Sequence, residues 1–322
     1  KNSGAITIPS KLLSEIVNKL PNETPVSLEV DENSDNILIK SDRGSFNLKG
    51  IPSDEYPNLP FVESGTSLNI DPSSFLKALK STIFASSNDD SKQLLTGVNF
   101  TFKPNYLESA STDGHRLAVA LIGNEEHIKN KENLSSNVDD LSVTIPTRSL
   151  REIEKLVSLR SSENSIKLFY DKGQVVFISS NQIITTRTLE GTYPNYSQLI
   201  PDSFSKILNF NTKKLIDSLE RIAVLADQQS SVVKIKLDDT DLASISADAQ
   251  DIGNANESIP VSYSGENFDI AFNVRYLLEG LKVIASENVL LKCNIATTPA
   301  VFVPEDNLNS FTYLVMPVQV RS

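Results

Sequence analysis

The sequence has one cysteine, two histidines and no tryptophan in 322 residues. A single cysteine excludes an internal disulfide framework and fits a reducing compartment, so a cytoplasmic protein is expected. Cys293 lies in a hydrophobic run, where a small buried residue is expected. His115 and His127 form no ligand cluster with it, so no metal and no other cofactor is predicted. The apolar runs are far shorter than the ~20 residues of a membrane span.

What the sequence does contain is a recurring strand that runs into a helix. In residues 144–157 an extended run ends at Pro146 and Thr147, and apolar residues then follow at helical spacing. The pattern predicts five helices, at residues 10–20, 72–83, 147–157, 212–225 and 274–285. The residues that lead into them are separated by 62, 75, 65 and 62 positions. Strand-like segments lie between the helices, among them residues 95–102, 258–263 and 311–318.

A longer repeat lies over this short one. Tyr56-Pro57-Asn58 returns 137 positions later as Tyr193-Pro194-Asn195, and Ile8 and Ile145 are separated by the same number of positions. Two different motifs with one shift indicate a duplicated domain, in which each copy holds two half-units of a strand, a helix and about three strands.

The repeat predicts an α+β protein with three domains. Residues 1–62 correspond to the second half of a domain, and residues 63–201 and 202–322 correspond to two complete domains. A sixth half-unit is therefore expected ahead of Lys1, which makes the chain a fragment. Residues 124–140 are polar and are expected to form a mobile bridge between half-units.

Charge is unevenly distributed along the chain. The net charge is −11, which taken alone argues against nucleic acid. The five predicted helices nevertheless carry twelve cations and six anions, whereas the remainder carries eighteen cations and 35 anions. If the helices share one surface, it is a positive stripe on a negative body, which is typical of binding to a polyanion. The alternative is that lysine and arginine simply favour solvated helix faces.

The most polar motif is the segment Ser111–Leu117. One interpretation is a hydrolase that uses Asp113 and His115, with Ser111 as nucleophile, but such a pair needs a third partner from elsewhere. Asp-Gly is first of all a turn signal. The patterns GxxxxGK[ST], GxGxxG and HExxH do not occur. A further alternative is a repeat scaffold that binds proteins without DNA.

The same motif carries a family resemblance. The segment Thr112–Ala118, TDGHRLA, resembles the central-domain signature of the bacterial DNA polymerase III beta subunit, the sliding clamp. Further segments resemble this family in the same order, namely Leu94–Val98, Thr144–Pro146, Glu190–Tyr196, Val261–Gly265 and Tyr313–Val318. The resemblance covers essentially the whole chain.

The resemblance implies a tether and not an enzyme. It implies the DNA clamp fold, with antiparallel sheets outside and helices that line a central hole. Two protomers would close a ring that encircles duplex DNA without sequence preference and acts as a processivity factor for polymerase III. The implied partners are the polymerase catalytic subunit, the clamp loader, and other polymerases and repair proteins, all through short peptide motifs. No membrane association is implied, and the protein would act in the cytoplasm at the nucleoid.

Family positions can be carried over residue by residue. The partner-peptide pocket, which accepts a short peptide with a Leu/Phe end, would comprise Leu95, Thr112, Gly114, His115, Arg116, Leu117, Pro194, Leu199, Leu314, Met316 and Pro317. The DNA-facing residues would be Lys11, Lys77, Lys80, Arg148, Arg151, Lys155, Lys213, Lys214, Arg221, Arg275 and Lys282. The dimer interface would use Arg43, Phe46, Leu48, Val224 and Leu225.

The chain departs from the family pattern at a few of these places. Gln198 stands where an arginine is common at the pocket rim, and the tail after Pro317 is slightly longer and less basic than usual. Both departures bear on partner affinity. Ser45 stands where a basic residue is common, so a weaker and less salt-sensitive dimer is expected.

Overall fold

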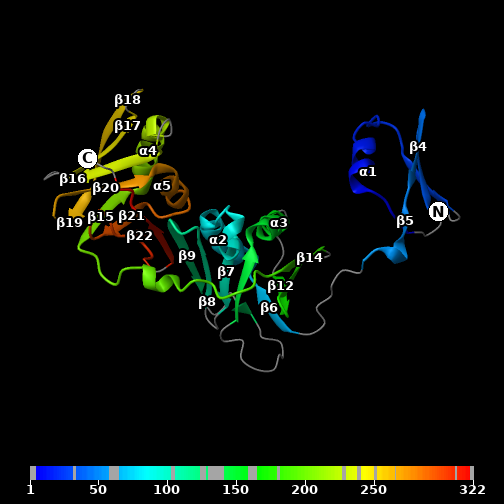
Figure 1. The fold of residues 1–322 in the computed structure, drawn as a ribbon, viewed down its shortest axis with the longest axis horizontal. Helices are drawn as coiled ribbons and strands as arrows, with labels where there is room; N and C mark the ends of the chain where they lie inside the picture. Colours follow the sequence, from blue (N-terminus) through cyan, green and yellow to red (C-terminus); the bar gives the residue numbers. More distant parts are fainter. Residues whose placement is uncertain are drawn as a thin grey trace. The chain divides into compact units, whose positions relative to one another are not determined.

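The computed structural model (Figure 1) forms two compact units, residues 1–61 and 62–322. The structure describes residues 5–31, 34–57, 65–102, 106–123, 128–129, 141–158, 165–179, 182–226, 230–237, 241–249, 252–264, 266–308 and 310–319. The predicted bridge at 124–140 therefore lies outside the described residues, apart from 128–129.

The described part of the first unit has one α-helix, a three-stranded antiparallel sheet and an antiparallel pair formed by its first and last strands. Its elements are β1 (Ile6–Thr7), α1 (Ser10–Val17), β2 (Ser27–Asp31), β3 (Asn36–Ser41), β4 (Gly44–Lys49), β5 (Ile51–Pro52) and the 3-10 helix η1 (Ser53–Glu55). The sheet order is β2-β3-β4, and Ile37 and Ile39 of β3 are buried. The helix predicted to reach residue 20 ends at Val17. There the amides of Lys19 and Leu20 bond to carbonyls three residues back, which tightens the last turn.

The second unit begins with the elements between residues 66 and 199, here called the β6–β14 portion. They are β6 (Thr66–Ile70), α2 (Pro72–Thr82), η2 (Ile83–Ala85), η3 (Asp90–Thr96), β7 (Gly97–Phe102), β8 (Tyr106–Thr112), β9 (Arg116–Gly123), β10 (Ile128–Lys129), β11 (Leu141–Pro146), α3 (Thr147–Ser158), β12 (Ile166–Asp171), β13 (Gln174–Ser179), β14 (Gln182–Arg187) and η5 (Tyr196–Leu199). The predicted strand 95–102 is wrong at its start, because Leu95 belongs to η3 and the strand begins at Gly97.

The β15–β23 portion completes the second unit. It contains β15 (Lys206–Asn211), α4 (Thr212–Ala226), β16 (Val232–Leu237), β17 (Leu242–Ala249), β18 (Gly253–Pro260), β19 (Ser262–Ser264), β20 (Phe268–Asn273), α5 (Val274–Leu281), β21 (Asn288–Cys293), β22 (Ala300–Pro304) and β23 (Phe311–Val315). The predicted strand 258–263 is wrong, because the chain changes sheets at Val261, between β18 and β19. The predicted strand 311–318 ends at Val315, since the amides of Met316 and Val318 bond to His115 and Ala271.

One nine-stranded sheet runs through both portions of the second unit. Its order is β11-β7-β8-β9-β23-β22-β21-β15-β19, and it is continuous because β9 pairs with β23 in antiparallel register. Leu117 lies opposite Leu314 in this pairing, and Ala118 lies opposite Tyr313. Paired residues share a face of a sheet, so the register assigns every strand residue to one of two sides.

Helices α2, α3, α4 and α5 all pack on the same side of this sheet. On that side Ser109 of β8 donates to the carbonyl of Ala78 in α2, and its register partner Phe100 shares a core with α3. Further along the sheet, Tyr313 shares a core with α4 and α5. We call this side the helix face. The opposite side, the outer face, carries Leu117 and Leu314, over which the segment 196–204 packs.

Candidate functional site

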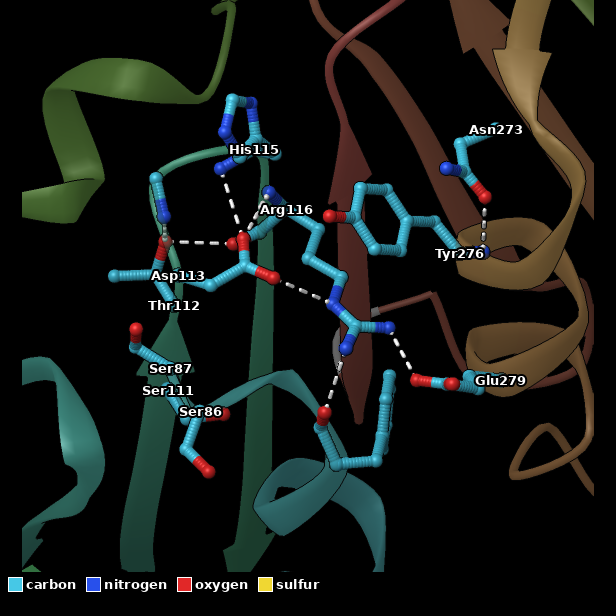
Figure 2. Close-up of polar contacts among 12 residues, drawn as sticks. Ser86, Ser87, Ser111, Thr112, Asp113, His115, Arg116, Asn273, Tyr276 and Glu279 are labelled. Atoms are coloured by element: carbon cyan, nitrogen blue, oxygen red, sulfur yellow. Dashed lines mark hydrogen bonds and ion pairs between the residues drawn. The ribbon is translucent and has the colours of Figure 1, made fainter. Parts of the chain in front are cut away.

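The polar motif at residues 112–117 forms a tight, fully bonded turn between β8 and β9 (Figure 2). The carboxylate of Asp113 accepts the backbone N–H groups of His115 at 2.8 Å and Arg116 at 3.1 Å. The Thr112 hydroxyl accepts the N–H of Gly114 and donates to the carbonyl of Arg116. Gly114 has φ +95°, a backbone conformation that glycine adopts without strain. The turn is therefore held by its own side chains.

This geometry argues against the hydrolase interpretation. The second carboxylate oxygen of Asp113 accepts from Nε of Arg116 at 3.0 Å, so Asp113 orients the turn and not the imidazole. The His115 ring points away from Asp113 and stacks at 6.5 Å, centroid to centroid, on Tyr276 of α5 (Figure 2). Ser111 is fully buried and donates to the carbonyl of Thr82. The nucleophile, base and acid that the hypothesis requires are not brought together.

Arg116 instead joins the two portions of the second unit. Its guanidinium binds Asp113 on its own turn, the carbonyl of Phe84 in η2 at 2.8 Å, and the carboxylate of Glu279 in α5. The guanidinium carbon also lies 4.4 Å from the centre of the Tyr276 ring. Burial disfavours the charge, but Tyr313 and Glu279 outweigh it and hold the pKa of Arg116 above its ordinary value.

The predicted pocket residues gather around this junction. Leu117 and Leu314 are buried side by side on the outer face, and the N–H of Met316 binds the carbonyl of His115 at 2.9 Å. Around them Leu199 is 53% exposed and Met316 38% exposed, while Pro194 is also exposed. The arrangement is an apolar floor over which the segment 196–204 packs, with accessible apolar side chains at its margin, and these exposed side chains suit an apolar anchor.

Other predicted pocket residues are connected to this floor through the turn. The N–H of Thr112 donates to the hydroxyl of Tyr193, next to Pro194, at 3.1 Å. Leu95 is half-buried in η3, where Lys92 of the same element donates to the carbonyl of Asp113 at 3.3 Å. Pro317 is half-buried in the tail beyond β23.

Sequence reasoning missed the contribution of α5 to this site. Tyr276 stacks with His115, and Asn273 caps the helix by accepting the N–H groups of Arg275 and Tyr276. The signal in the sequence was Tyr276, an aromatic residue in the first turn of the predicted helix 274–285, where only the cations had been assigned a role. Which distant helix would reach His115 cannot be read from sequence spacing, because the contact depends on the β9–β23 pairing.

The predicted DNA-facing residues are all exposed, and all of them lie on helices except Lys282, which follows the last residue of α5. Four of them pair with acids: Lys155 with Glu152, Lys213 with Asp217, Arg221 with Glu257, and Lys282 with Glu220. Lys77, Lys80, Arg148, Arg151 and Lys214 pair with no acid among the described residues. Among the described residues, the helix face thus carries both cations that pair with an acid and cations that do not.

The predicted dimer residues lie in both units. Phe46 is 38% exposed and Val224 is 68% exposed, while Leu48 and Leu225 are half-buried. Phe46 and Leu48 lie opposite the buried Ile39 and Ile37 of β3, so they belong to the apolar side of the first sheet.

No group of three or more His, Cys, Asp or Glu side chains in the described residues could hold a metal ion. Within the same residues no helix has the length and apolar character required to cross a membrane.

Comparison with known proteins now adds to this geometry. Profiles of the DNA polymerase III beta subunit match the chain over its length, with the N-terminal domain at residues 1–60, the central domain at 69–195 and the C-terminal domain at 197–319. The chain belongs to the DNA polymerase III beta subunit family. Its function is that of a sliding clamp, a processivity factor, and not of an enzyme.

Individual relatives agree with this assignment. The chain is 42% identical to the beta sliding clamp of Synechococcus elongatus over 323 residues, which cover 100% of this chain and 83% of the relative. It is 32% identical to the beta sliding clamp of Bacillus subtilis, covering 98% and 80%. A crystal structure of the DNA polymerase sliding clamp from Bacillus subtilis superposes with a TM-score of 0.86 at 29% identity, covering 99% of this chain and 80% of that one. The predicted family, clamp fold and non-enzymatic function are confirmed.

Proposed function

We propose that the exposed cations of α1 to α5 face duplex DNA and that the pocket around Leu117 and Leu314 receives short peptide segments of polymerase, clamp loader and repair proteins. The protein would act in the cytoplasm at the nucleoid, as a homodimeric ring. Its domains would follow the division 1–62, 63–201 and 202–322.

The observation that supports the DNA contact is the common side on which α2, α3, α4 and α5 pack. Because one continuous sheet carries all four helices, their solvent-facing residues point away from the same side of that sheet. Lysine and arginine side chains on such a surface attract phosphates without reading base sequence. A ring that encircles DNA stays on it without tight binding. Weak phosphate contacts are therefore sufficient, and they let the ring slide along the duplex.

Retention on circular DNA tests this proposal. The protein, assembled with a clamp loader on nicked circular DNA, is expected to co-elute with the DNA in gel filtration and to be lost when the same DNA is linearised. Equal retention on both forms would indicate ordinary binding. No retention on either form would favour a protein-binding scaffold.

The peptide site is tested by fluorescence anisotropy with a labelled peptide that has a Leu/Phe end. His115→Ala and Met316→Ala are expected to weaken binding about tenfold, as is typical of contacts near an apolar anchor. Ile295→Ala is a matched control, because Ile295 is 58% exposed and lies outside the predicted pocket. The assignment is wrong if Ile295→Ala weakens binding as much as Met316→Ala does.

The dimer proposal keeps the expectation of weak, salt-tolerant association. Sedimentation velocity should show a dimer whose dissociation constant changes little as salt is added, because few charges flank the apolar residues Phe46 and Val224. A tight dimer that dissociates steeply with salt would contradict it.

A further inference from the structure

A second hollow lies on the outer face beside the peptide site. It has a volume of about 610 Å³, within the range of ligand-binding pockets. Its floor is formed by Asn99, Thr101, Ser142 and Thr144 on β7 and β11, and its far wall by the segment 188–197. Neither Leu117, Leu314 nor Met316 lines it. It is therefore distinct from the apolar floor described above.

Strand register places this hollow on the same side of the sheet as the peptide site. Asn99 lies opposite Thr144 on β11 and opposite Ala110 on β8, and Ala110 belongs to the same apolar cluster as Leu117 and Leu314. Tyr193 and Pro194 connect the two places, because both line the hollow while the Tyr193 hydroxyl accepts the N–H of Thr112. Pro194 therefore belongs both to the predicted peptide site and to the lining of the hollow.

Acids and aromatic rings are among the groups that line the hollow, and no lysine, arginine or histidine of the described part of the chain lines it. Its two carboxylates are those of Glu108 and Glu190, and neither pairs with a cation among the described residues. Tyr170, Tyr193 and Tyr196 add three aromatic rings. Carboxylates and aromatic faces in one recess are the groups that bind guanidinium and ammonium ions.

The recess is also held in shape by its own hydrogen bonds. The Tyr196 hydroxyl donates to one carboxylate oxygen of Glu108, and the amide of Asn99 donates to the hydroxyls of Ser142 and Thr144 at 3.1 Å each. The N–H of Leu189 binds the carbonyl of Thr144 at 2.8 Å, which fixes the far wall to β11. Burial raises the pKa of both Tyr193 and Tyr196, so both stay neutral at physiological pH.

We propose that this hollow binds an arginine or lysine side chain of the same partner segment whose apolar end occupies the site beside Leu117 and Leu314. The proposal rests on the proposed peptide site and adds a second specificity to it. A partner would be recognised by an apolar anchor together with a basic residue at its flank, and the free carboxylate of Glu190 would be the principal contact for that residue.

The test uses labelled peptides and the full chain. One peptide has only the Leu/Phe end flanked by alanines, and two others carry a pair of arginines on one or the other flank. One arginine peptide is expected to bind about fivefold more tightly than the alanine peptide at low salt, with the gain shrinking as salt rises. Glu190→Gln should abolish the gain and Glu108→Gln should reduce it, while leaving the affinity for the alanine peptide unchanged.

Asp202→Asn is the matched control, because it removes one exposed negative charge from the segment 196–204, outside the hollow. The inference is overturned if neither arginine peptide gains affinity, or if Asp202→Asn removes the gain as fully as Glu190→Gln does. Failure of the peptide site can be distinguished from failure of the hollow. If the peptide site is wrong, the alanine peptide does not bind, or it binds Met316→Ala as tightly as it binds the unchanged protein.

Discussion

Replacing Arg116 by methionine is the most informative perturbation of this chain. Methionine keeps an unbranched apolar side chain as far as the position of Nε but removes every polar contact of the guanidinium. Arg116 is 8% exposed in its side chain, and its contacts connect β9, η2 and α5. The substitution therefore tests whether this one side chain holds the β6–β14 and β15–β23 portions together.

The expected cost can be worked out contact by contact. The Glu279 carboxylate is 48% exposed, so its ion pair is discounted to about 0.5 kcal/mol. Asp113 is 14% exposed, and loss of its charge-assisted bond costs about 1.5 kcal/mol because two backbone donors remain. The carbonyl of Phe84 loses its guanidinium donor, at about 1 kcal/mol. The stack on Tyr276 adds about 1 kcal/mol. The total is about 4 kcal/mol, from which new methionine packing subtracts a part.

Urea unfolding followed by far-UV circular dichroism measures this loss. Arg116→Met is expected to lower the free energy of unfolding of the second unit by about 3 to 4 kcal/mol. Glu279→Gln should lower it by only about 0.5 kcal/mol. Arg116→Lys should fall between them, because an ammonium keeps the charge but lacks the planar fork. A loss below about 1 kcal/mol for Arg116→Met, or an equal loss for Glu279→Gln, would refute the reasoning.

Three further expectations concern the core and the helix face. Gly280→Ala should destabilise the protein by about 1 to 3 kcal/mol in the same urea assay, because a Cβ there would meet the ring of Tyr313; no loss would mean that the ring can move. Burial raises the pKa of the Cys293 thiol from 9.0 to about 11, so the contribution of the neutral thiol to stability is fully present below pH 9 and is lost as pH rises through 11. At pH 8 a thiol reagent should therefore label Cys293 only after the protein unfolds, and rapid labelling of the folded protein would contradict this. Arg148→Ala should weaken low-salt retention on DNA more than Lys213→Ala, because Lys213 is already paired with an acid; equal effects would show that the pairing is irrelevant.

The repeating helices could be predicted because the signal that specifies them is local. Asp71 accepts the N–H of Ser74 and Pro72 occupies the first turn of α2, as the capping pattern indicates. Apolar spacing then determined which residues face the core, and Leu150 and Ile153 are buried accordingly. The predicted C-terminal ends of α1 and α5 were less accurate. After both helices the backbone hydrogen bonds span three residues instead of four, a change that the spacing of apolar residues does not reveal.

The candidate site was less predictable because its contacts are not local. Leu117 meets Leu314 across a sheet that joins segments almost two hundred residues apart, and Arg116 reaches Glu279 only because of that pairing. The Asp113–His115 motif was the opposite case. Its local chemistry resembled a catalytic pair, whereas Asp113 is engaged by the turn and by Arg116.

The charge pattern and the sheet topology together constrain how tightly the helix face can hold DNA. Lys282, directly after α5, pairs with Glu220 on α4, so part of the positive charge is neutralised by a contact between these two segments. Exposed pairs of this kind contribute little stability, yet each one reduces the charge available to a phosphate. Among the described residues, the predicted DNA-facing cations of the helix face without an acidic partner are Lys77, Lys80, Arg148, Arg151 and Lys214. Helix α2 carries two cations and no acid, whereas α3 and α4 each carry three cations and two acids, so the positive field of these three helices is strongest over α2. If the helix face contacts DNA as proposed, α2 is where a phosphate would be held most strongly.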